Sequence, residues 1–439
     1  MATDWPSATV AELQHQGVLL VEDGNHGEYR PRPDEFVQTG VAFIRAADMD
    51  DGRVLFEVAD HINETARARI TKGIGAPGDV LLSHKGTVGK VALVRDDAPA
   101  FVCSPQTTFW RTRNKDRLDP RYLYAFLRSP GFHLQLASRA GETDMAPYVS
   151  LTAQRALRVS LPPMDVQRSI GRILAALDDK IELDRQMNET LEAMARALFK
   201  SWFVDFDPVR VKAVGRDPAL PQRIADLFPD RFDMSELGEI PAGWRVGRFG
   251  TVAETVREPV DPRLAPNSVF SHFSIPAFDD DQTAKAEPGE AIRSLKWGVP
   301  PGAVLLSKLN PEIERVWLTD VKDDHSVCST EFVVLRPRQP FGRPYLYCLA
   351  RSPSVRQRLE SLVTGTSKSH QRAHVEDILM LPTILPPAHV NEAFDSAAAP
   401  LLERILVAKR QSLTLASLRD ALLPKLISGE LRVAELEHA

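Results

Sequence analysis

The sequence predicts an α+β protein made of two tandem globular domains and two long antiparallel helices, related by a pseudo-two-fold internal repeat. Three observations support this fold class. The 439-residue chain repeats its own motifs at a spacing of about 224 residues, and such self-similarity indicates a duplicated architecture. Within each copy, short β-rich runs alternate with turn signals. Each copy then ends in a long stretch whose apolar residues recur every three or four positions, as in a helix.

The repeat is seen in four pairs of segments that keep their order and almost their spacing. One such match could arise by chance, but four in register within about one residue would not follow from composition alone. We therefore predict that the two halves of the chain share one backbone design. The pairs are Pro77–Ser83 with Pro301–Ser307, Val102–Ser104 with Val327–Ser329, Tyr122–Pro130 with Tyr345–Pro353, and Leu161–Pro163 with Leu385–Pro387.

Composition predicts a globular chain of roughly two to four domains. Hydrophobic residues make up 43% of it and charged residues 26%, which is ordinary for a soluble protein. The first residues lack the basic start and apolar run of a signal peptide, and no apolar stretch is long enough for a membrane span, so we expect a cytoplasmic protein. Cys103, Cys328 and Cys348 show no metal-ligand spacing. We interpret them as small strand residues in a reducing compartment, with a disulfide or a zinc site as the alternative.

Positive charge is concentrated locally although the net charge is −5. Residues 65–140 hold 13 Lys and Arg against 5 Asp and Glu, and residues 341–375 hold 6 against 1. Arg111 and Arg113 alternate with other residues along one β-rich run that continues to Lys115 and Arg117. Such a row could follow a phosphate backbone, or it could be one solvated face of a strand.

Short strands are expected in both copies, separated by turn residues. Gly86–Gly89 is expected to form a hairpin turn, because the full spacing of a phosphate-binding loop is absent and no helix follows. Each copy should therefore form a small α+β domain. The expected β-rich runs are 79–84, 90–95 and 101–113 in the first copy, and 303–309, 315–319 and 331–336 in the second.

Helical periodicity extends over residues 165–203 and again over 390–427. Each helix would be roughly 55 Å long at 1.5 Å per residue, and an apolar stripe of that length needs a partner. We expect the two helices to pair antiparallel as a spacer; the alternative is that each packs on its own domain. The stripe assigned to pairing and partner docking consists of Ile170, Leu174, Leu177, Ile181, Leu191, Leu198, Trp202, Phe203, Leu401, Ile405, Leu415 and Leu422.

Three segments resemble one protein family. Phe199–Val209, which reads FKSWFVDFDPV, closely resembles the central region of the specificity subunit of type I restriction-modification systems. Leu237–Trp244 (LGEIPAGW) resembles the beginning of that family's second target-recognition domain, and Leu422–Leu431 (LLPKLISGEL) resembles its C-terminal region. The resemblance covers essentially the whole chain and is strongest in the two helices.

The resemblance implies that each repeat is a target-recognition domain that reads one half of a bipartite site in double-stranded DNA. The helices would space the two halves and dock two methyltransferase subunits, and restriction/translocase subunits would complete the complex. The half-sites should be unrelated, since the two domains differ in sequence. The implied boundaries are 1–160 for domain one, 161–204 for the first long helix, 205–237 for a linker, 238–384 for domain two and 385–430 for the second long helix.

The family's recognition domains carry a Gly-containing polar loop before their last strand, and Gly141–Tyr148 and Gly365–Arg372 occupy that position here. Hydroxyl, amide and cationic side chains suit phosphates and base edges, whereas the first loop is more acidic and could accept from cytosine amino groups. Residues at strand ends are second candidates, and each candidate could equally be a solvated loop residue. The DNA-binding candidates are His84, Lys85, Lys90, Arg111, Arg113, Thr143, Tyr148, Lys308, Asn310, Thr366, Ser367, Lys368, Gln371 and Arg372.

No catalytic motif is found in the sequence. An amino-methyltransferase tetrapeptide, a Gly-rich cofactor loop, a Walker motif and a zinc-ligand cluster are absent, and His370 with His374 is interpreted as a surface pair rather than a metal site. We expect a non-catalytic subunit that itself binds no cofactor or metal. By the resemblance, the methyltransferase partner would bind S-adenosylmethionine and the restriction partner ATP and Mg²⁺. The chain would be required for site-specific adenine methylation and for the restriction endonuclease activity of the complex.

Two other functions stay open. The chain could be a non-enzymatic coiled-coil interaction scaffold, and then its binding would be indifferent to competitor DNA. It could also be a stand-alone DNA-binding protein, and then it would form no stable complex with a methyltransferase. Sequence-specific DNA recognition within a complex predicts, in contrast to the scaffold, binding that weakens steeply with salt.

Overall fold

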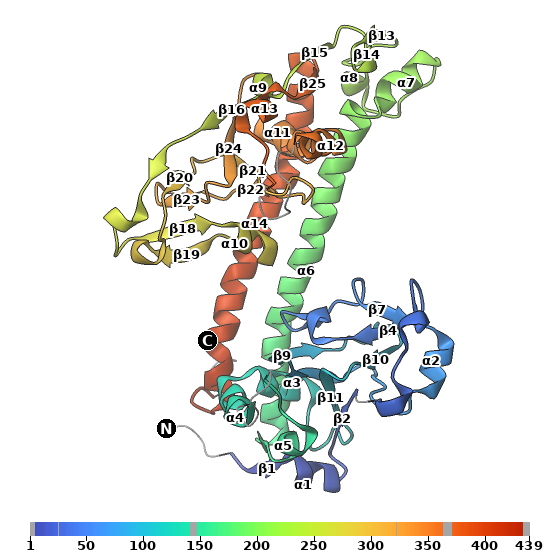
Figure 1. Cartoon of the computed structure of the whole chain (residues 1–439), viewed down its shortest axis with the longest axis vertical. Coiled ribbons are helices and arrows are strands. Elements are labelled where there is room, and N and C mark those ends of the chain that lie inside the picture. Colours follow the sequence, from blue (N-terminus) through green and yellow to red (C-terminus); the bar gives the residue numbers. More distant parts are fainter. Residues whose placement is uncertain (1–4, 25, 141–146, 322, 363–370, 433–439) are drawn as a thin grey trace. The chain divides into compact units, whose positions relative to one another are not determined.

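The computed structural model describes residues 5–24, 26–140, 147–321, 323–362 and 371–432. The chain divides into two compact units, each of which is described by itself. Unit 1 comprises Met1–Leu183 and Gln411–Ala439, and unit 2 comprises Asp184–Arg410. Each unit therefore contains one globular domain and one part of each of two long helices (Figure 1).

The domain of unit 1 contains two four-stranded sheets. Val80, Leu81 and Leu82 in the first sheet have no exposed surface, as expected for a continuous apolar run in a buried strand. The first sheet has the order β2 (Leu19–Asp23), β11 (Thr107–Thr112), β8 (Val80–Lys85) and β9 (Thr87–Leu93), with all neighbours antiparallel. The second has the order β10 (Phe101–Cys103), β4 (Val41–Ile44), β7 (Asp60–Ile62) and β3 (Phe36–Val37), in which β10 and β4 are parallel.

Helices and short strand pairs complete this domain. The helix α3 (Pro120–Arg128) begins after Asp119, whose carboxylate accepts hydrogen bonds from the N–H groups of Arg121 and Tyr122 and so caps the helix. The other elements are β1 (Ser7–Thr9) paired with β12 (Arg158–Ser160), β5 (Met49–Asp50) paired with β6 (Arg53–Val54), and the helices α1 (Val10–His15), η1 (Gly27–Tyr29), η2 (Pro33–Glu35), η3 (Ala46–Asp48), α2 (Glu64–Arg69), α4 (Pro130–Ala140) and α5 (Leu151–Arg155).

The domain of unit 2 has the same plan with one further strand. Its first sheet has the order β16 (Ala253–Val256), β24 (Phe332–Pro337), β21 (Val304–Ser307) and β22 (Val316–Leu318). Its second has the order β17 (Pro259–Val260), β20 (Lys296–Gly298), β23 (Ser326–Cys328), β18 (Val269–Phe273) and β19 (Lys285–Pro288). The other elements are α7 (Asp207–Ala213), α8 (Gln222–Ala225), β13 (Phe232–Ser235) paired with β14 (Gly238–Pro241), β15 (Arg245–Arg248) paired with β25 (Pro382–Leu385), α9 (Phe249–Val252), η4 (Pro262–Leu264), α10 (Ile275–Asp280), η5 (Gly289–Ala291), α11 (Arg343–Ala350), α12 (Pro353–Ser361) and α13 (Val375–Met380).

The internal repeat extends to individual backbone pairs. β10 is parallel to β4 in unit 1, and β23 is likewise parallel to β18 in unit 2. An isolated antiparallel bridge joins Lys85 to Tyr148, and another joins Leu309 to Arg372, which are the same two positions shifted by 224 residues. The duplication inferred from sequence motifs is therefore confirmed as a duplication of the fold.

Two long helices, α6 (Met164–Phe203) and α14 (Ala388–Ile427), pair antiparallel within each unit. In unit 1, Leu174 near the start of α6 shares a hydrophobic core with Leu426 near the end of α14. In unit 2, an aromatic cluster at the end of α6 packs on Phe394 near the start of α14. The predicted α+β fold class with long antiparallel helices is confirmed.

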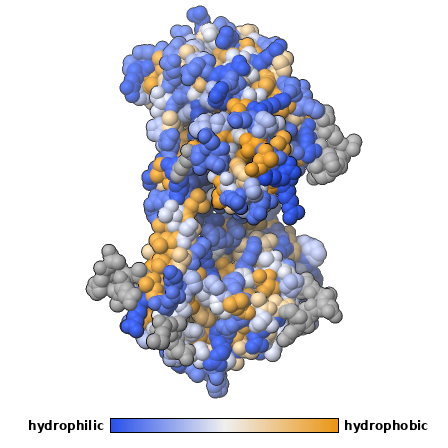
Figure 2. Space-filling model, turned by 90° about the vertical axis from the view of Figure 1, so that its left-hand side faces the viewer, coloured by the Kyte–Doolittle hydropathy of each residue, from blue (hydrophilic) through white to orange (hydrophobic). Residues whose placement is uncertain are grey.

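The residues predicted to form the helical stripe face the packed interior to different degrees. Ile170, Leu174, Trp202, Phe203 and Ile405 are buried, and Leu177, Ile181, Leu191, Leu198, Leu401, Leu415 and Leu422 are half-buried. Other large apolar side chains of the two helices are exposed, namely Leu183, Met194, Val407, Leu413 and Leu418. On the face drawn in Figure 2, apolar surface gathers in patches between larger hydrophilic areas. Within the described residues, no helix is both long enough and apolar enough to cross a membrane.

Three local expectations are wrong. The hairpin expected at Gly86–Gly89 is present between β8 and β9, but its extent is wrong: the turn contains only Gly86, whose positive φ of 79° suits glycine, and β9 already begins at Thr87. The run expected over 101–113 is divided into β10 and β11 and ends at Thr112, so Arg113 lies beyond the strand. Cys348 lies in α11 rather than in a strand, whereas Cys103 and Cys328 are strand residues; all three are buried free thiols.

The segment 205–237, expected as a linker, is folded against unit 2. It contains α7, α8 and β13. Phe206, Val209 and Phe228 are buried in the core of that unit, and the ring of Phe228 lies 5.1 Å from that of Trp202. Single apolar residues spread among polar residues and prolines give no periodic signal, and for this reason the sequence did not reveal their burial.

Candidate nucleic-acid interface

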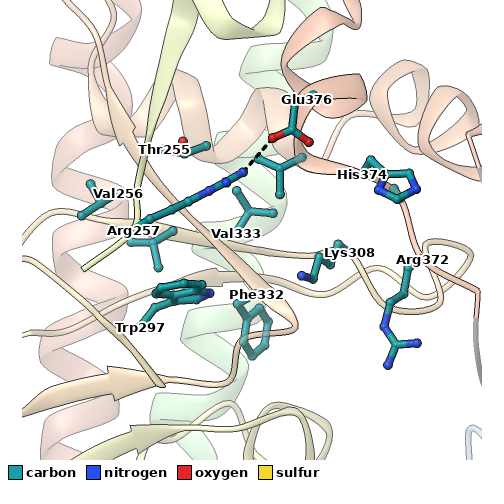
Figure 3. A pocket seen from close by; sticks show the side chains of 13 residues that line it. Thr255, Val256, Arg257, Trp297, Lys308, Phe332, Val333, Arg372, His374 and Glu376 are labelled. Atoms are coloured by element: carbon teal, nitrogen blue, oxygen red, sulfur yellow. Dashed lines mark hydrogen bonds and ion pairs between the residues drawn. The ribbon is translucent and has the colours of Figure 1, made fainter. Parts of the chain in front are cut away.

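A cavity of about 360 Å³ opens in the domain of unit 2, beside the edge strand β16 and next to α13. Its walls come from five separate stretches of chain (Figure 3). The lining residues are Thr255, Val256, Arg257, Trp297, Lys308, Phe332, Val333, Val334, Arg372, Ala373, His374, Val375 and Glu376. We call it the unit 2 cavity.

Backbone pairing brings two predicted groups of residues together at this cavity. The N–H of Asn310 donates to the carbonyl oxygen of Gln371 at 3.0 Å, and the N–H of Ala373 donates to the carbonyl oxygen of Lys308 at 3.0 Å. The loop after β21 and the segment before α13 therefore lie side by side. The structure thus joins Lys308, Asn310, Gln371 and Arg372, which were proposed separately on their sequence positions.

Three cationic side chains line the unit 2 cavity. Arg372 forms a paired hydrogen bond with Glu331, at 3.0 and 2.9 Å, and this carboxylate raises the pKa of the guanidinium. Arg257 donates to Glu376 at 3.1 Å, and both side chains are well exposed. Among the described residues, Lys308 has no side-chain ion pair or hydrogen bond. The lysine is therefore the cation most available to an anionic ligand at this place.

Two aromatic rings lie beside these cations. Phe332 is 1% exposed, and the half-buried Trp297 packs against the hydrophobic cluster that contains it. Figure 3 shows both rings on the wall of the cavity, with Lys308 close by. Of the two rings, only Trp297 keeps exposed surface; cations that can contact phosphates next to an aromatic face that can contact a base or sugar are usual components of a nucleic-acid surface.

The equivalent place in unit 1 carries different chemistry. His84 is 1% exposed, its Nδ1 lies 3.1 Å from the carbonyl oxygen of Val149, and its Nε2 is buried without a partner among the described residues. Burial lowers the pKa of this histidine, so the ring is neutral at pH 7 and Nε2 is an acceptor. Its ring centroid lies 5.6 Å from that of Tyr148, over which the exposed Lys85 places its ammonium at 5.9 Å.

Two predicted residues of unit 1 have structural partners instead. Arg111 forms a paired ion bridge to Asp79, at 2.6 and 2.7 Å, and also donates to the carbonyl oxygen of Ile74 at 3.0 Å. The Nζ of Lys90 donates to the carbonyl oxygen of Met49 at 2.7 Å. Arg113 is exposed just beyond β11. The row of alternating cations is therefore not a strand edge that could follow a phosphate backbone.

Some predicted residues lie outside the described part of the chain, and some residues that line the cavity were not predicted. Thr143, Thr366, Ser367 and Lys368 lie outside the described residues. Sequence reasoning did not assign Arg257, Trp297, Phe332 and His374 to a DNA-binding site, because they come together at the cavity only in the folded domain.

Comparison with known proteins finds similarity to one family. The family model described as "Type I restriction modification DNA specificity domain" matches residues 27–193. The chain is 26% identical over 388 residues to the Type I restriction enzyme MjaIX specificity subunit of Methanocaldococcus jannaschii, covering 86% of this chain and 83% of that protein. It is 24% identical over 450 residues to the Type I restriction enzyme HindI specificity subunit of Haemophilus influenzae, covering 89% and 94%.

A solved structure supports the fold. The S subunit of a type I restriction-modification system from M. genitalium superposes with a TM-score of 0.58 over 96% of both chains, at 12% sequence identity. Sequence relatives along almost the whole chain and this shared fold agree with the internal repeat and the paired helices described above. The domain match and the two relatives support the identification of the chain as a type I restriction-modification specificity subunit, the subunit that supplies DNA sequence specificity.

Proposed function

We propose that each unit reads one half of a bipartite DNA site, and that unit 2 does so at its cavity. One observation carries this proposal. The same backbone bridge, Lys85 with Tyr148 and Leu309 with Arg372, is surrounded by different side chains in the two units. A common frame with different chemistry is what the reading of two unrelated half-sites requires.

The two surfaces differ in what they can contact. In unit 2, Lys308 and Arg372 offer donors to phosphates and to the acceptors of guanine, while Trp297 offers an apolar face. In unit 1, His84 is buried together with its Nε2, so the exposed Lys85 supplies the donors, beside the ring of Tyr148.

The long helices would dock the partners. Leu183, Met194, Val407, Leu413 and Leu418 keep apolar surface exposed on α6 and α14, and exposed apolar residues on a regular element suit protein contacts. In the proposed complex, two methyltransferase subunits bind this surface, and restriction/translocase subunits join them. The methyltransferase would bind S-adenosylmethionine and extrude an adenine of each half-site, and the restriction partner would bind ATP and Mg²⁺. The chain itself would supply position and discrimination, without a catalytic step.

The decisive experiment maps adenine methylation in host cells whose partner genes are intact. The chain is replaced by the variant Lys308→Ala with Arg372→Ala. We expect methylation at the cognate motif to fall by about tenfold or more, because cations that contact bases or phosphates each supply on the order of 1 kcal/mol or more. The half-site read by unit 1 should stay the same in whatever methylation remains.

Arg223→Ala is the matched control. It removes one exposed cation from α8 in the same unit, and this residue does not line the cavity. The control should leave the methylation map unchanged. An unaltered map for the double variant would contradict the role of the unit 2 cavity, and a wild-type map without any two-part motif would contradict the proposed function as a whole.

A further inference from the structure

A tyrosine and an arginine four residues apart recur in the two domains. Tyr124 and Arg128 lie on α3, and Tyr347 and Arg351 lie on α11. In α3 the guanidinium donates to the tyrosine hydroxyl at 2.8 Å, and in α11 the corresponding distance is 2.5 Å. Both tyrosines are almost fully buried, with 7% and 4% of their surface exposed. The repeat therefore preserves one small side-chain unit on one helix of each domain.

Each of these arginines binds a carboxylate of α6. In unit 1, Arg128 donates to Asp178 at 2.9 Å. In unit 2, Arg351 forms an ion pair with Glu192, and the hydroxyl of Tyr347 donates to the same carboxylate at 2.7 Å. We call Tyr124, Arg128 and Asp178 the unit 1 clamp, and Tyr347, Arg351 and Glu192 the unit 2 clamp.

Both clamps belong to small charge networks with little solvent. Arg419 of α14 donates to Asp178 at 2.8 Å and is 9% exposed at its side chain, so the unit 1 clamp also joins the second long helix. Arg351 donates to Glu314 at 2.6 Å, and Arg196 of α6 lies 3.7 Å from the same carboxylate. In both networks nearby carboxylates neutralise the charges of the arginines, and this pairing reduces the free-energy cost of removing the arginines from water.

The carboxylates are not themselves repeated. The residue that corresponds to Asp178 at the 224-residue offset is Leu402, on α14. Repetition would have placed the second clamp on α14, yet both clamps use carboxylates of α6. The duplicated domains thus share the Tyr and Arg half of the clamp, and one helix supplies the acidic half to both.

We propose that the two clamps are positioning devices that hold each recognition domain at one place on α6, and that they thereby restrict the complex to one gap length between the half-sites. This inference rests on the proposed function. A domain that is free to shift on its helix would accept half-sites at more than one spacing, although the side chains that read the bases would be unaltered. A broken buried ion pair leaves an unpaired charge that favours such a shift.

The test compares the gap lengths methylated by the complete complex with the wild-type chain, with Asp178→Asn and with Glu192→Gln. Both variants keep the size of the side chain and remove its charge. We expect both half-site sequences to be retained. Methylation at sites whose gap is one base pair longer or shorter should rise about tenfold. This change requires only part of the free energy that is lost when one partner of a buried ion pair is removed.

Control variants separate positioning from general damage. Glu189→Gln removes an exposed carboxylate of α6 that pairs with Arg185 one turn away on the same helix, and it should leave the single gap intact. Asp178→Glu should restore the single gap by restoring the carboxylate. Should a charge-removing variant fail to assemble, Tyr124→Phe and Tyr347→Phe delete only the hydroxyls, and they should widen the gap preference by a smaller factor.

Three results of the methylation test would overturn either the positioning role of the clamps or the proposed function. A single unchanged gap in the charge-removing variants, or in the tyrosine variants where those are needed, would overturn the positioning role. Loss of one half-site sequence with the gap preserved would also overturn it, because the clamp would then act on reading. A wild-type complex that methylates no two-part motif would instead overturn the proposed function, and this result is distinct from the other two.

Discussion

Asp79 has no exposed side-chain surface, and Arg111 neutralises it through two hydrogen bonds. The arginine at the equivalent position of the other copy, Arg336, pairs with Glu254 at the surface, where its side chain is 57% exposed. One position of the repeat therefore holds a buried ion pair in unit 1 and an exposed one in unit 2. Surrounding burial, and not residue type, decides how much each pair contributes.

These two arginines provide a matched stability test. Arg111→Ala would leave the buried carboxylate of Asp79 unpaired, and we expect the free energy of unfolding to fall by about 3–5 kcal/mol. Arg336→Ala should lower it by less than about 1 kcal/mol, because exposed pairs contribute little. Urea unfolding followed by tryptophan fluorescence measures both values. If Arg111→Ala lost DNA affinity while keeping its stability, the structural assignment of this residue would be refuted.

At the scale of secondary-structure elements, the long helices depend on a few large side chains. Phe394 of α14 has no exposed surface, and its ring centroid lies 5.7, 6.1 and 5.1 Å from those of Phe199, Trp202 and Phe203 of α6. Aromatic edges packed on aromatic faces add to the burial of apolar area. This cluster, and not helix propensity, holds the two helices together in unit 2.

Truncation of the cluster should therefore destabilise unit 2. We expect Phe394→Ala to lower the free energy of unfolding by about 3–5 kcal/mol, since a buried aromatic side chain would be replaced by a cavity. Val407→Ala on the same helix, where the side chain is exposed, should change it by less than about 0.5 kcal/mol. The comparison requires chemical denaturation of the two variants under one condition. Equal effects would show that the aromatic cluster does not hold the pair.

At the scale of the whole molecule, the net charge of −5 opposes DNA binding while cations gather in restricted regions. Three cationic side chains line the unit 2 cavity, and two of them, Arg257 and Arg372, are each bound to a carboxylate. The positive electrostatic potential of the cavity is therefore partly neutralised. Affinity for phosphates would then depend on partner subunits that add positive surface. The chain is in this respect suited to discrimination between sequences more than to tight binding by itself.

Salt dependence tests this view of the whole molecule. We expect the isolated chain to bind a cognate duplex weakly, and the complex with methyltransferase subunits to bind it tightly and to lose about 10³-fold or more in affinity between 50 and 200 mM salt. Fluorescence anisotropy of a labelled duplex measures both. Tight sequence-specific binding by the isolated chain would contradict the expectation, and binding that is indifferent to salt would favour the scaffold.

Much of the architecture followed from the sequence by itself, because periodicity and repetition are local signals. The 224-residue repeat predicted two domains of one design, and the three- and four-residue spacing of apolar positions predicted both long helices. Phe199–Val209 and its companion motifs pointed to the family. Order along the chain was sufficient for these conclusions, since each concerns neighbours or a fixed offset.

Only the tertiary structure decided which charged and aromatic residues work together. Arg111 proved to be the partner of a buried carboxylate 32 positions away, and Trp297 and Arg372 meet at one cavity from different parts of the chain. Hydrophobic periodicity reports which face of an element is buried, but it cannot report which side chain lies opposite. That choice depends on strand pairing and helix contacts over long sequence separations, and so the candidate site, unlike the fold, could not be read from the sequence alone.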